Sequence, residues 1–187
     1  LKEKVFPTLL KENLNKRIRV WSSACSTGEE PYTLGITLIE SLGSLLSQWD
    51  AKILATDIDS DVLAKAKQGV YSKDRVEEIP KPIVKKWFHN GIGKNDNKVK
   101  VDSRISNLIT FKKLNLLHQW PMKGPFDVIF CRNVLIYFDK ETQESLIERY
   151  HEMLTPNGYL MLGHSENLSK NQQHIFKAIG RTIFQKV

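Results

Sequence analysis

The fold class of this chain is predicted most clearly by the stretch Arg19-Val20-Trp21-Ser22-Ser23-Ala24-Cys25-Ser26-Thr27-Gly28-Glu29-Glu30-Pro31-Tyr32. It begins with β-favouring residues, passes into small or hydroxylated residues up to Gly28, and continues as an apolar helical pattern. Pro31 falls in the first turn of that helix, where a missing N–H does no harm. A strand, a tight loop of small residues and a helix N-terminus together predict the nucleotide-binding corner of an open α/β sheet.

Two adjacent carboxylates, Glu29 and Glu30, open the predicted helix. A helix N-terminus attracts anions, so a phosphate site would avoid two carboxylates at this place. A ligand that carries an amine and a sulfonium but no phosphate would tolerate them, and S-adenosylmethionine is such a ligand. The alternative is that both side chains simply complement the helix dipole.

A further acidic position follows the next predicted strand. Residues 51–56 have the pattern of a buried strand that ends at Asp57, about 30 residues after the Gly28 loop. A carboxylate there can hold both ribose hydroxyls, because it accepts two hydrogen bonds at once. The usual spacing is ~20 residues, and the long preceding helix explains the difference. Asp59 is the alternative ribose ligand, although its position suits the cap of the following helix.

The rest of the chain continues the alternation of strands and helices. Pro80 and Pro82 interrupt a polar stretch, and the alternation Lys98-Val99-Lys100-Val101 predicts a half-exposed antiparallel strand. We interpret the segment from about 70 to 107 as a small β-subdomain inserted at the edge of the main sheet, with a long crossover as the alternative. The other predicted elements are helices at about 30–46 and 140–154, strands at 108–112, 126–130 and 159–163, and a C-terminal hairpin around Gly180.

Composition places the chain among soluble globular proteins. It has 187 residues, of which 41% are hydrophobic and 26% charged, and no apolar run approaches the ~18 residues that span a bilayer. The first residues lack the apolar core of a signal peptide, and the two cysteines, Cys25 and Cys131, do not suggest a disulfide framework. We therefore expect a cytoplasmic single domain of residues 1–187, without membrane insertion. We also expect the protein to be a monomer.

The formal net charge is +7, and lysines crowd the middle of the chain. A basic surface can bind nucleic acid, steer the molecule toward a glutamate-rich protein surface, or simply be solvated. No nucleic-acid motif and no interleaving of aromatic and basic residues favours the first of these. A nucleic-acid partner is therefore not expected.

Four segments, in this order, resemble the signature motifs of the CheR family, the chemotaxis receptor methyltransferases. They are Ser23-Ala24-Cys25-Ser26-Thr27-Gly28-Glu29-Glu30-Pro31-Tyr32, Ala55-Thr56-Asp57-Ile58-Asp59, Phe126-Asp127-Val128-Ile129-Phe130-Cys131-Arg132-Asn133-Val134-Leu135-Ile136-Tyr137-Phe138 and Gly163-His164-Ser165-Glu166-Asn167. The likeness runs from about Phe6 to the C-terminus. It implies an α/β, Rossmann-like methyltransferase fold with a mostly parallel sheet of about seven strands, an antiparallel last strand and a small β-subdomain.

The resemblance also implies a function. Members of the family transfer a methyl group from S-adenosylmethionine to glutamate side chains of methyl-accepting chemotaxis receptors, leaving S-adenosylhomocysteine, and use the small β-subdomain for receptor contacts. A non-catalytic S-adenosylmethionine-binding module and a methyltransferase acting on another substrate are the alternatives. The family carries a helical N-terminal domain and an arginine-ending linker before this segment, so the natural protein is expected to be longer.

By the same resemblance, residues at several strand ends surround the cofactor. The positions carried over are Ala24, Gly28, Glu30, Asp57, Asn115, Leu116, Arg132 and Asn133 for cofactor binding, and Tyr137 and Arg132 for catalysis. Arg132 and Asn133 would border the methionine end, and Tyr137 would lie beside the transferred methyl. Asn115 and Leu116 would lie beside adenine. Without the resemblance, Asn115 is a turn residue, Leu116 a core residue and Tyr137 a packing residue of a loop.

Cys131 and His164 suggest two other kinds of chemistry. Cys131 could be a nucleophile, but no His follows at an informative spacing, and we interpret it as a small buried residue. His164 lies near Glu166, so a His–carboxylate pair is conceivable, although we interpret His164 as a structural residue at the rim of the cofactor site. The histidines have no spacing typical of metal ligands, so no metal site is expected.

Overall fold

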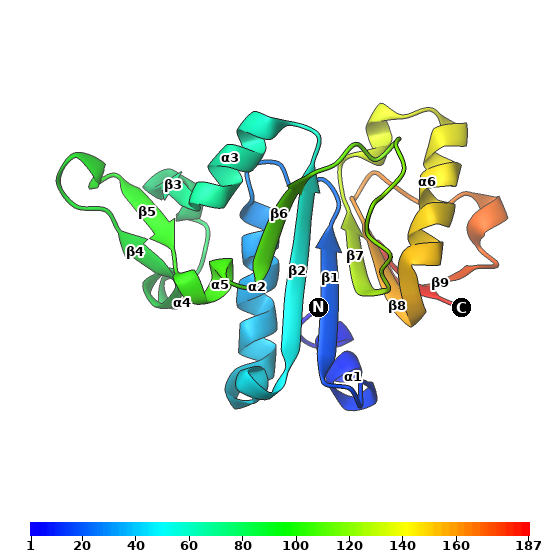
Figure 1. Cartoon of the computed structure of the whole chain (residues 1–187), viewed down its shortest axis with the longest axis horizontal. Coiled ribbons are helices and arrows are strands. Elements are labelled where there is room, and N and C mark those ends of the chain that lie inside the picture. The colour runs from blue at the N-terminus through cyan, green and yellow to red at the C-terminus, as the bar shows by residue number, and fades with distance from the viewer.

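The main sheet has seven strands in the order β6-β2-β1-β7-β8-β10-β9 (Figure 1). The computed structural model describes residues 1–187. Across the sheet, the strands are β6 (Ile109–Lys113), β2 (Asp50–Asp57), β1 (Arg17–Ser22), β7 (Phe126–Cys131), β8 (Leu154–Leu162), β10 (Ile183–Lys186) and β9 (Phe176–Gly180). The first five are parallel, and β10 is antiparallel to both of its neighbours. The predicted Rossmann-like α/β fold, with its antiparallel last strand, is confirmed.

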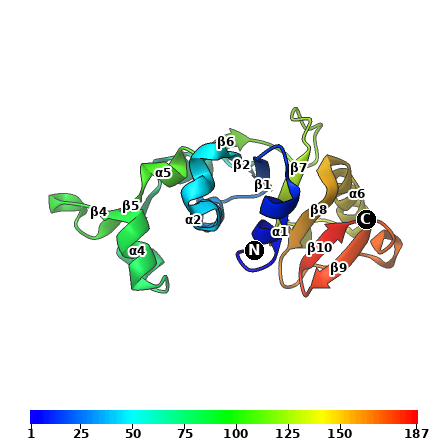
Figure 2. The same ribbon diagram turned by 90° about the horizontal axis from the view of Figure 1, so that it is seen from below.

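Helices lie on both faces of this sheet (Figure 2). Helices α1 (Val5–Glu12), α2 (Glu29–Leu42) and α3 (Ser60–Gln68) pack on one face, and α6 (Lys140–Met153) packs on the other. Successive residues of β1 contact different faces of the sheet, because side chains along a strand point alternately to its two faces. Val20 belongs to the apolar cluster under α2, whereas Trp21 belongs to the cluster under α6. The sheet is therefore the middle of three layers.

A second, three-stranded antiparallel sheet projects beyond the β6 edge (Figure 1). Its order is β3 (Val70–Ser72), β5 (Lys98–Val101) and β4 (Phe88–Asn90), and the short helices α4 (Lys81–Trp87) and α5 (Ser103–Ser106) flank it. Trp87 is buried where this sheet joins the main body, and its indole N–H donates to Glu40 of α2 at 3.2 Å. The small β-subdomain predicted in the fold is confirmed, and the long-crossover alternative is wrong.

Two predicted boundaries are wrong. The helix predicted to run to residue 46 ends at Leu42, because Gly43 has a φ of 52° and leads into a 3-10 turn, Gly43–Gln48. The strand predicted at 159–163 begins already at Leu154, since a register shift against β7 absorbs the Pro156-Asn157-Gly158 turn residues. Neither change moves the carboxyl end of a parallel strand by more than one residue.

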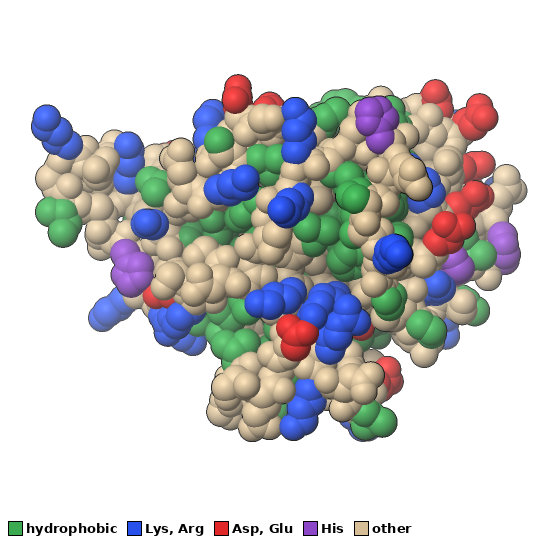
Figure 3. Space-filling model, viewed as in Figure 1, with side chains coloured by type: hydrophobic (Ala, Val, Ile, Leu, Met, Phe, Trp, Pro, Cys, Tyr) green, Lys and Arg blue, Asp and Glu red, His purple; other side chains and the backbone are tan.

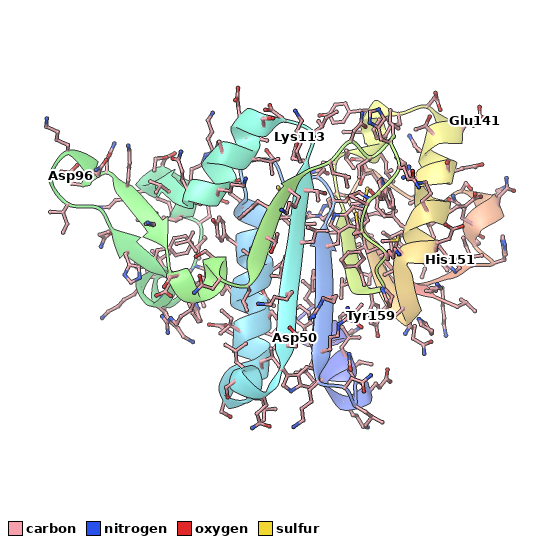
Figure 4. The ribbon with its side chains drawn as sticks, in the orientation of Figure 1. Asp50, Asp96, Lys113, Glu141, His151 and Tyr159 are labelled. Carbon is pink, nitrogen blue, oxygen red and sulfur yellow. The ribbon has the colours of Figure 1, made fainter.

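The carboxyl ends of the parallel strands lie together along one edge of the molecule. Lys113 ends β6 at this edge, and Asp50 begins β2 at the opposite one (Figure 4). Lys and Arg side chains are spread over the left and centre of Figure 3, whereas acidic side chains gather at the right, over α6. No helix is both long enough and apolar enough to cross a bilayer.

Candidate functional site

A cavity of ≈ 1030 Å³ opens at the carboxyl ends of β1, β2 and β7. The chain leaves β1 toward β2 on one side and returns through β7 on the other, so this is the switch point at which open α/β sheets bind ligands. Its lining includes Ser23, Ala24, Cys25, Ser26, Glu29, Glu30, Asp57, Ile58, Asn115, Leu116, Leu117, Arg132, Asn133, Val134, Tyr137 and Phe138. Every predicted site residue except Gly28 lies on this lining.

The loop after β1 is held by its backbone. Ser23 N–H donates to the Phe130 carbonyl at 2.9 Å, and Cys25 N–H donates to the Thr56 carbonyl at 2.8 Å. These bonds tie the loop to both neighbouring strands and leave its small side chains at the cavity wall. The loop is therefore fixed relative to β2 on one side and β7 on the other.

Gly28 shapes the loop from behind the cavity. It is buried with a φ of 98°, and an added Cβ would lie 2.9 Å from both the Ala66 Cβ and the Tyr71 hydroxyl. The Tyr71 hydroxyl, from β3 of the small sheet, donates to the Thr27 carbonyl at 2.7 Å. The structure therefore gives Gly28 a conformational role and places it away from the lining.

Asp57 ends β2 at the edge of the cavity. Its Oδ2 accepts from the Ser26 N–H at 2.8 Å, and its Oδ1 accepts from the Asp59 N–H at 3.0 Å. Asp59 instead caps α3, because its Oδ1 accepts from Asp61 N–H at 2.7 Å and Val62 N–H at 3.4 Å. The geometry agrees with the prediction that Asp59 caps the helix and that Asp57 faces the ligand site. The ribose contact of Asp57 itself stays a prediction.

Glu30 and Arg132 face each other across the site. Glu30 accepts from the Ser22 hydroxyl at 2.7 Å, and its other oxygen lies 3.6 Å from Arg132 Nη1. Burial raises the pKa of the Glu30 carboxyl, while the Ser22 hydrogen bond and the Arg132 charge oppose that rise. Glu30 is thus a half-buried acid whose ionised form would be stabilised by a further positive charge in the cavity.

The segment after β6 forms an apolar wall at the other end of the cavity. Leu116 is buried, while Asn115 accepts from Leu117 N–H through its Oδ1 at 2.9 Å, as expected of a turn residue. The exposed side chains of Leu117 and Ile58 line the same end. Sequence reasoning missed Ile58 and Leu117, because a solvent-exposed apolar residue in a loop has no period that marks it.

The segment Arg132–Phe138 follows β7 and carries three predicted site residues. Asn133 has a φ of 57°, and Leu135–Tyr137 form one 3-10 turn. Tyr137 is 78% exposed at the cavity, so the packing role considered for it is wrong. Buried Glu166 and the half-buried Gln143 of α6 bind the backbone of this segment. The sequence indicated neither role.

Three further predictions concern residues with reactive side chains. Cys131 is fully buried, and burial raises the pKa of its thiol to about 12, which confirms it as a small buried residue. His164 is exposed, and Glu166 bonds to backbone amides, so a pair between the two does not form. No group of three or more His, Cys, Asp or Glu side chains is placed to hold a metal ion.

The sequence of this chain is similar to a known protein family and to named bacterial proteins. The family model described as "CheR methyltransferase, SAM binding domain" matches residues 1–184. The "Probable chemotaxis protein methyltransferase" of Rhizobium etli is 43% identical over 186 residues, covering 99% of this chain and 69% of that protein. "Chemotaxis protein methyltransferase 2" of Pseudomonas aeruginosa is 45% identical over 171 residues, covering 91% of this chain and 60% of that protein.

The solved structures support the fold. A TehB-like SAM-dependent methyltransferase from Corynebacterium glutamicum superimposes with a TM-score of 0.51 over 97% of this chain and 84% of that one, at 11% identity. At this identity the likeness concerns the arrangement of helices and strands alone. The chain spans 60–69% of the length of the two chemotaxis methyltransferases named above.

Proposed function

Since the chain belongs to the CheR methyltransferase family, we propose that it transfers a methyl group from S-adenosylmethionine to glutamate side chains of methyl-accepting chemotaxis receptors. The names of the two bacterial relatives support a chemotaxis role. The observation that carries the proposal is the charge of the cavity. Glu29, Glu30 and Asp57 line it with Arg132 as the one basic residue, in a molecule whose net charge is +7.

The residues of the cavity fit this cofactor. Glu30, whose pKa is raised by burial despite the nearby Arg132, suits the ammonium of the methionine end, because a second positive charge would stabilise its ionised form. Asp57 sits at the end of β2, where a carboxylate can accept from two ribose hydroxyls. Leu116, Leu117 and Ile58 offer an apolar end for adenine. A volume of ≈ 1030 Å³ is at the upper end of the usual range for small-molecule sites.

The cofactor supplies a methyl group on a positively charged sulfur, and the chain's residues need only bring a carboxylate to it. A substrate glutamate has an ordinary pKa of about 4.3, so it is ionised at neutral pH without a general base. We assign Arg132 to attract this carboxylate and Tyr137 to align it at the mouth of the cavity. Because charge is neutralised as the carboxylate attacks, exclusion of water favours the transfer, and catalysis is largely in-line positioning.

The partner is a protein surface in this proposal. Basic side chains spread over the face shown in Figure 3 would steer the molecule toward a glutamate-rich receptor segment. We propose that the chain acts as a monomer in the cytoplasm, where the methylated part of a receptor would be reached without crossing a membrane. The small sheet β3-β5-β4 is the part we assign to receptor contact.

Two measurements test the proposed function in sequence. Calorimetry should detect S-adenosylhomocysteine binding to the chain, and labelled methyl transfer should then occur to a purified cytoplasmic receptor fragment. A matched fragment whose exposed glutamates are replaced by alanine should accept no label. Binding without transfer to the receptor would instead identify a non-catalytic module or a methyltransferase for another substrate.

A further inference from the structure

We propose that Glu166 is a positioning residue for methyl transfer: it holds the segment Arg132–Phe138 in the shape that presents Arg132, Asn133 and Tyr137 to the cavity. This inference rests on the proposed function, and it goes further by giving a role to a residue that does not line the cavity. Glu166 lies in the loop after β8, on a different strand connection from the residues it serves.

Four backbone amides converge on the Glu166 carboxylate. Its Oε2 accepts from Gly163 N–H at 2.6 Å and Asn133 N–H at 3.0 Å. Its Oε1 accepts from Val134 N–H and Leu135 N–H, both at 2.8 Å. The residue is 7% exposed and has no cationic partner within ion-pair distance. Both oxygens are therefore fully engaged by the backbone of two loops.

The chemistry of this cluster requires a carboxylate. Two oxygens can accept four hydrogen bonds, and bonds to a charged acceptor are stronger than those between neutral groups. A glutamine has almost the same shape, but its amide nitrogen would point donors at two of the backbone N–H groups. Replacement by glutamine would thus preserve the packing and disrupt the amide cluster.

The bound amides lie within the segment that carries the site. Arg132 precedes the first of them, and Tyr137 follows the last by two residues. Asn133 holds a φ of 57°, which is unusual for a residue other than glycine and needs surrounding contacts to persist. From the other side, the Gln143 side-chain amide of α6 donates to the carbonyls of Leu135 at 3.0 Å and Phe138 at 2.9 Å.

Gly163 gives independent support for close contact between the two loops. A Cβ at this position would lie 2.6 Å from Asn133 Oδ1, 2.7 Å from Glu166 Oε2 and 2.9 Å from Asn133 N. Any other residue would push the loop after β7 away from the loop after β8. The pairing of β7 with β8 brings the two loops together, and the absence of a side chain at Gly163 leaves room for the Glu166 carboxylate to bridge them.

The test compares Glu166→Gln with the control Glu148→Gln, which removes an exposed carboxylate of α6. Methyl-transfer kinetics, S-adenosylhomocysteine affinity, amide hydrogen exchange and thermal unfolding are measured on both. We expect Glu166→Gln to fold, to lose exchange protection at Asn133, Val134 and Leu135, and to lose about 10–100-fold in kcat with a smaller change in KM. A residue that only fills space would leave the exchange rates and kcat of this near-isosteric variant unchanged, as in the control.

A second variant covers the case in which Glu166→Gln does not fold. Gly163→Ala leaves the carboxylate in place and separates the same loops, so it should reproduce the loss of kcat and of amide protection. If both variants fail to fold, or if either folds with wild-type exchange and kinetics, the positioning role is overturned. If the wild type itself transfers no methyl group, the proposed function fails, and the inference is then decided by amide exchange and S-adenosylhomocysteine affinity alone.

Discussion

Asp57 and Asp59 are two carboxylates of one turn with different partners. Asp57 lines the cavity and accepts from backbone N–H groups of Ser26 and Asp59, whereas Asp59 is exposed and caps α3. Substitution of Asp57 therefore tests ligand binding, and substitution of Asp59 tests the stability of α3.

Asp57→Ala should weaken S-adenosylhomocysteine binding by about 1.5–3 kcal/mol, as expected for the loss of hydrogen bonds to a charged group. Asp59→Ala should leave that affinity unchanged and lower the free energy of unfolding by about 0.5–2 kcal/mol through the lost cap. Calorimetry and chemical denaturation measure the two effects. Wild-type affinity in Asp57→Ala would disprove the ribose assignment.

Glu30 should make cofactor binding depend on pH. Its carboxyl pKa is raised by burial, so part of the population is protonated in a range where an ordinary glutamate is ionised. Only the ionised form attracts an ammonium group, and affinity should therefore rise as the pH increases through the Glu30 pKa and then level off. Calorimetric titrations with S-adenosylhomocysteine between about pH 5 and pH 6.5 measure this, because an amine with an ordinary pKa of about 7.7–8.0 stays protonated over that range.

Glu30→Gln is the matched control for the pH dependence. It should bind more weakly than the wild type at the upper end of the range and show no rise with pH. A wild-type affinity that falls as the pH increases, or a variant that keeps the rise, would assign the dependence to another group.

Tyr137 projects from the segment after β7 and is 78% exposed, so its removal should not disturb packing. Tyr137→Phe should lower kcat for methyl transfer more than it weakens S-adenosylhomocysteine binding, because an interaction made mainly in the transition state acts on turnover. Steady-state kinetics and calorimetry give the two numbers. Equal losses in both would make Tyr137 a cofactor ligand only.

At the scale of elements, the small sheet contacts the loop that forms the cofactor cavity. Tyr71 of β3 donates to the Thr27 carbonyl at 2.7 Å, and its ring packs edge-on against Tyr32 of α2 with centroids 6.1 Å apart. Arg75 lies 3.8 Å from Glu29. The position of the loop is therefore linked to that of a sheet outside the main fold.

Tyr71→Phe should weaken S-adenosylhomocysteine binding about two- to tenfold, the usual effect of one hydrogen bond, although Tyr71 does not line the cavity. Lys98→Ala, at an exposed position of β5 in the same sheet, serves as the control and should bind normally. Calorimetry measures both. An unchanged affinity in Tyr71→Phe would mean that the loop keeps its shape without this brace.

The elements that sequence reasoning predicted well are those with a strong local pattern. The β1 loop, the Asp59 cap and the alternation of β5 each follow from a few adjacent residues. Strand β8 was predicted too short, because the register shift that carries it through Pro156 depends on its neighbour β7. Glu166 escaped prediction for the same reason: its amide partners at 133–135 are more than 30 residues away in sequence.

At the scale of the whole molecule, the net charge is positive, whereas the side chains that line the cavity are mainly negative. The chain carries a net charge of +7, yet the cavity at the carboxyl ends of β1, β2 and β7 is lined by three carboxylates and one arginine. This arrangement suits a cationic cofactor inside and an acidic protein partner outside. The two requirements meet at the mouth of the cavity, where Arg132 and Tyr137 lie.

The chemical nature of the product distinguishes methyl transfer to glutamate from methyl transfer to any other acceptor. The chain is incubated with S-adenosylmethionine labelled in its methyl group and a cytoplasmic receptor fragment, and the labelled fragment is then treated with mild alkali. A glutamate methyl ester hydrolyses under these conditions, so we expect the label to be released as volatile methanol. Label that stays on the receptor after alkali, or no label on it while S-adenosylhomocysteine binds, would contradict methyl transfer to glutamate.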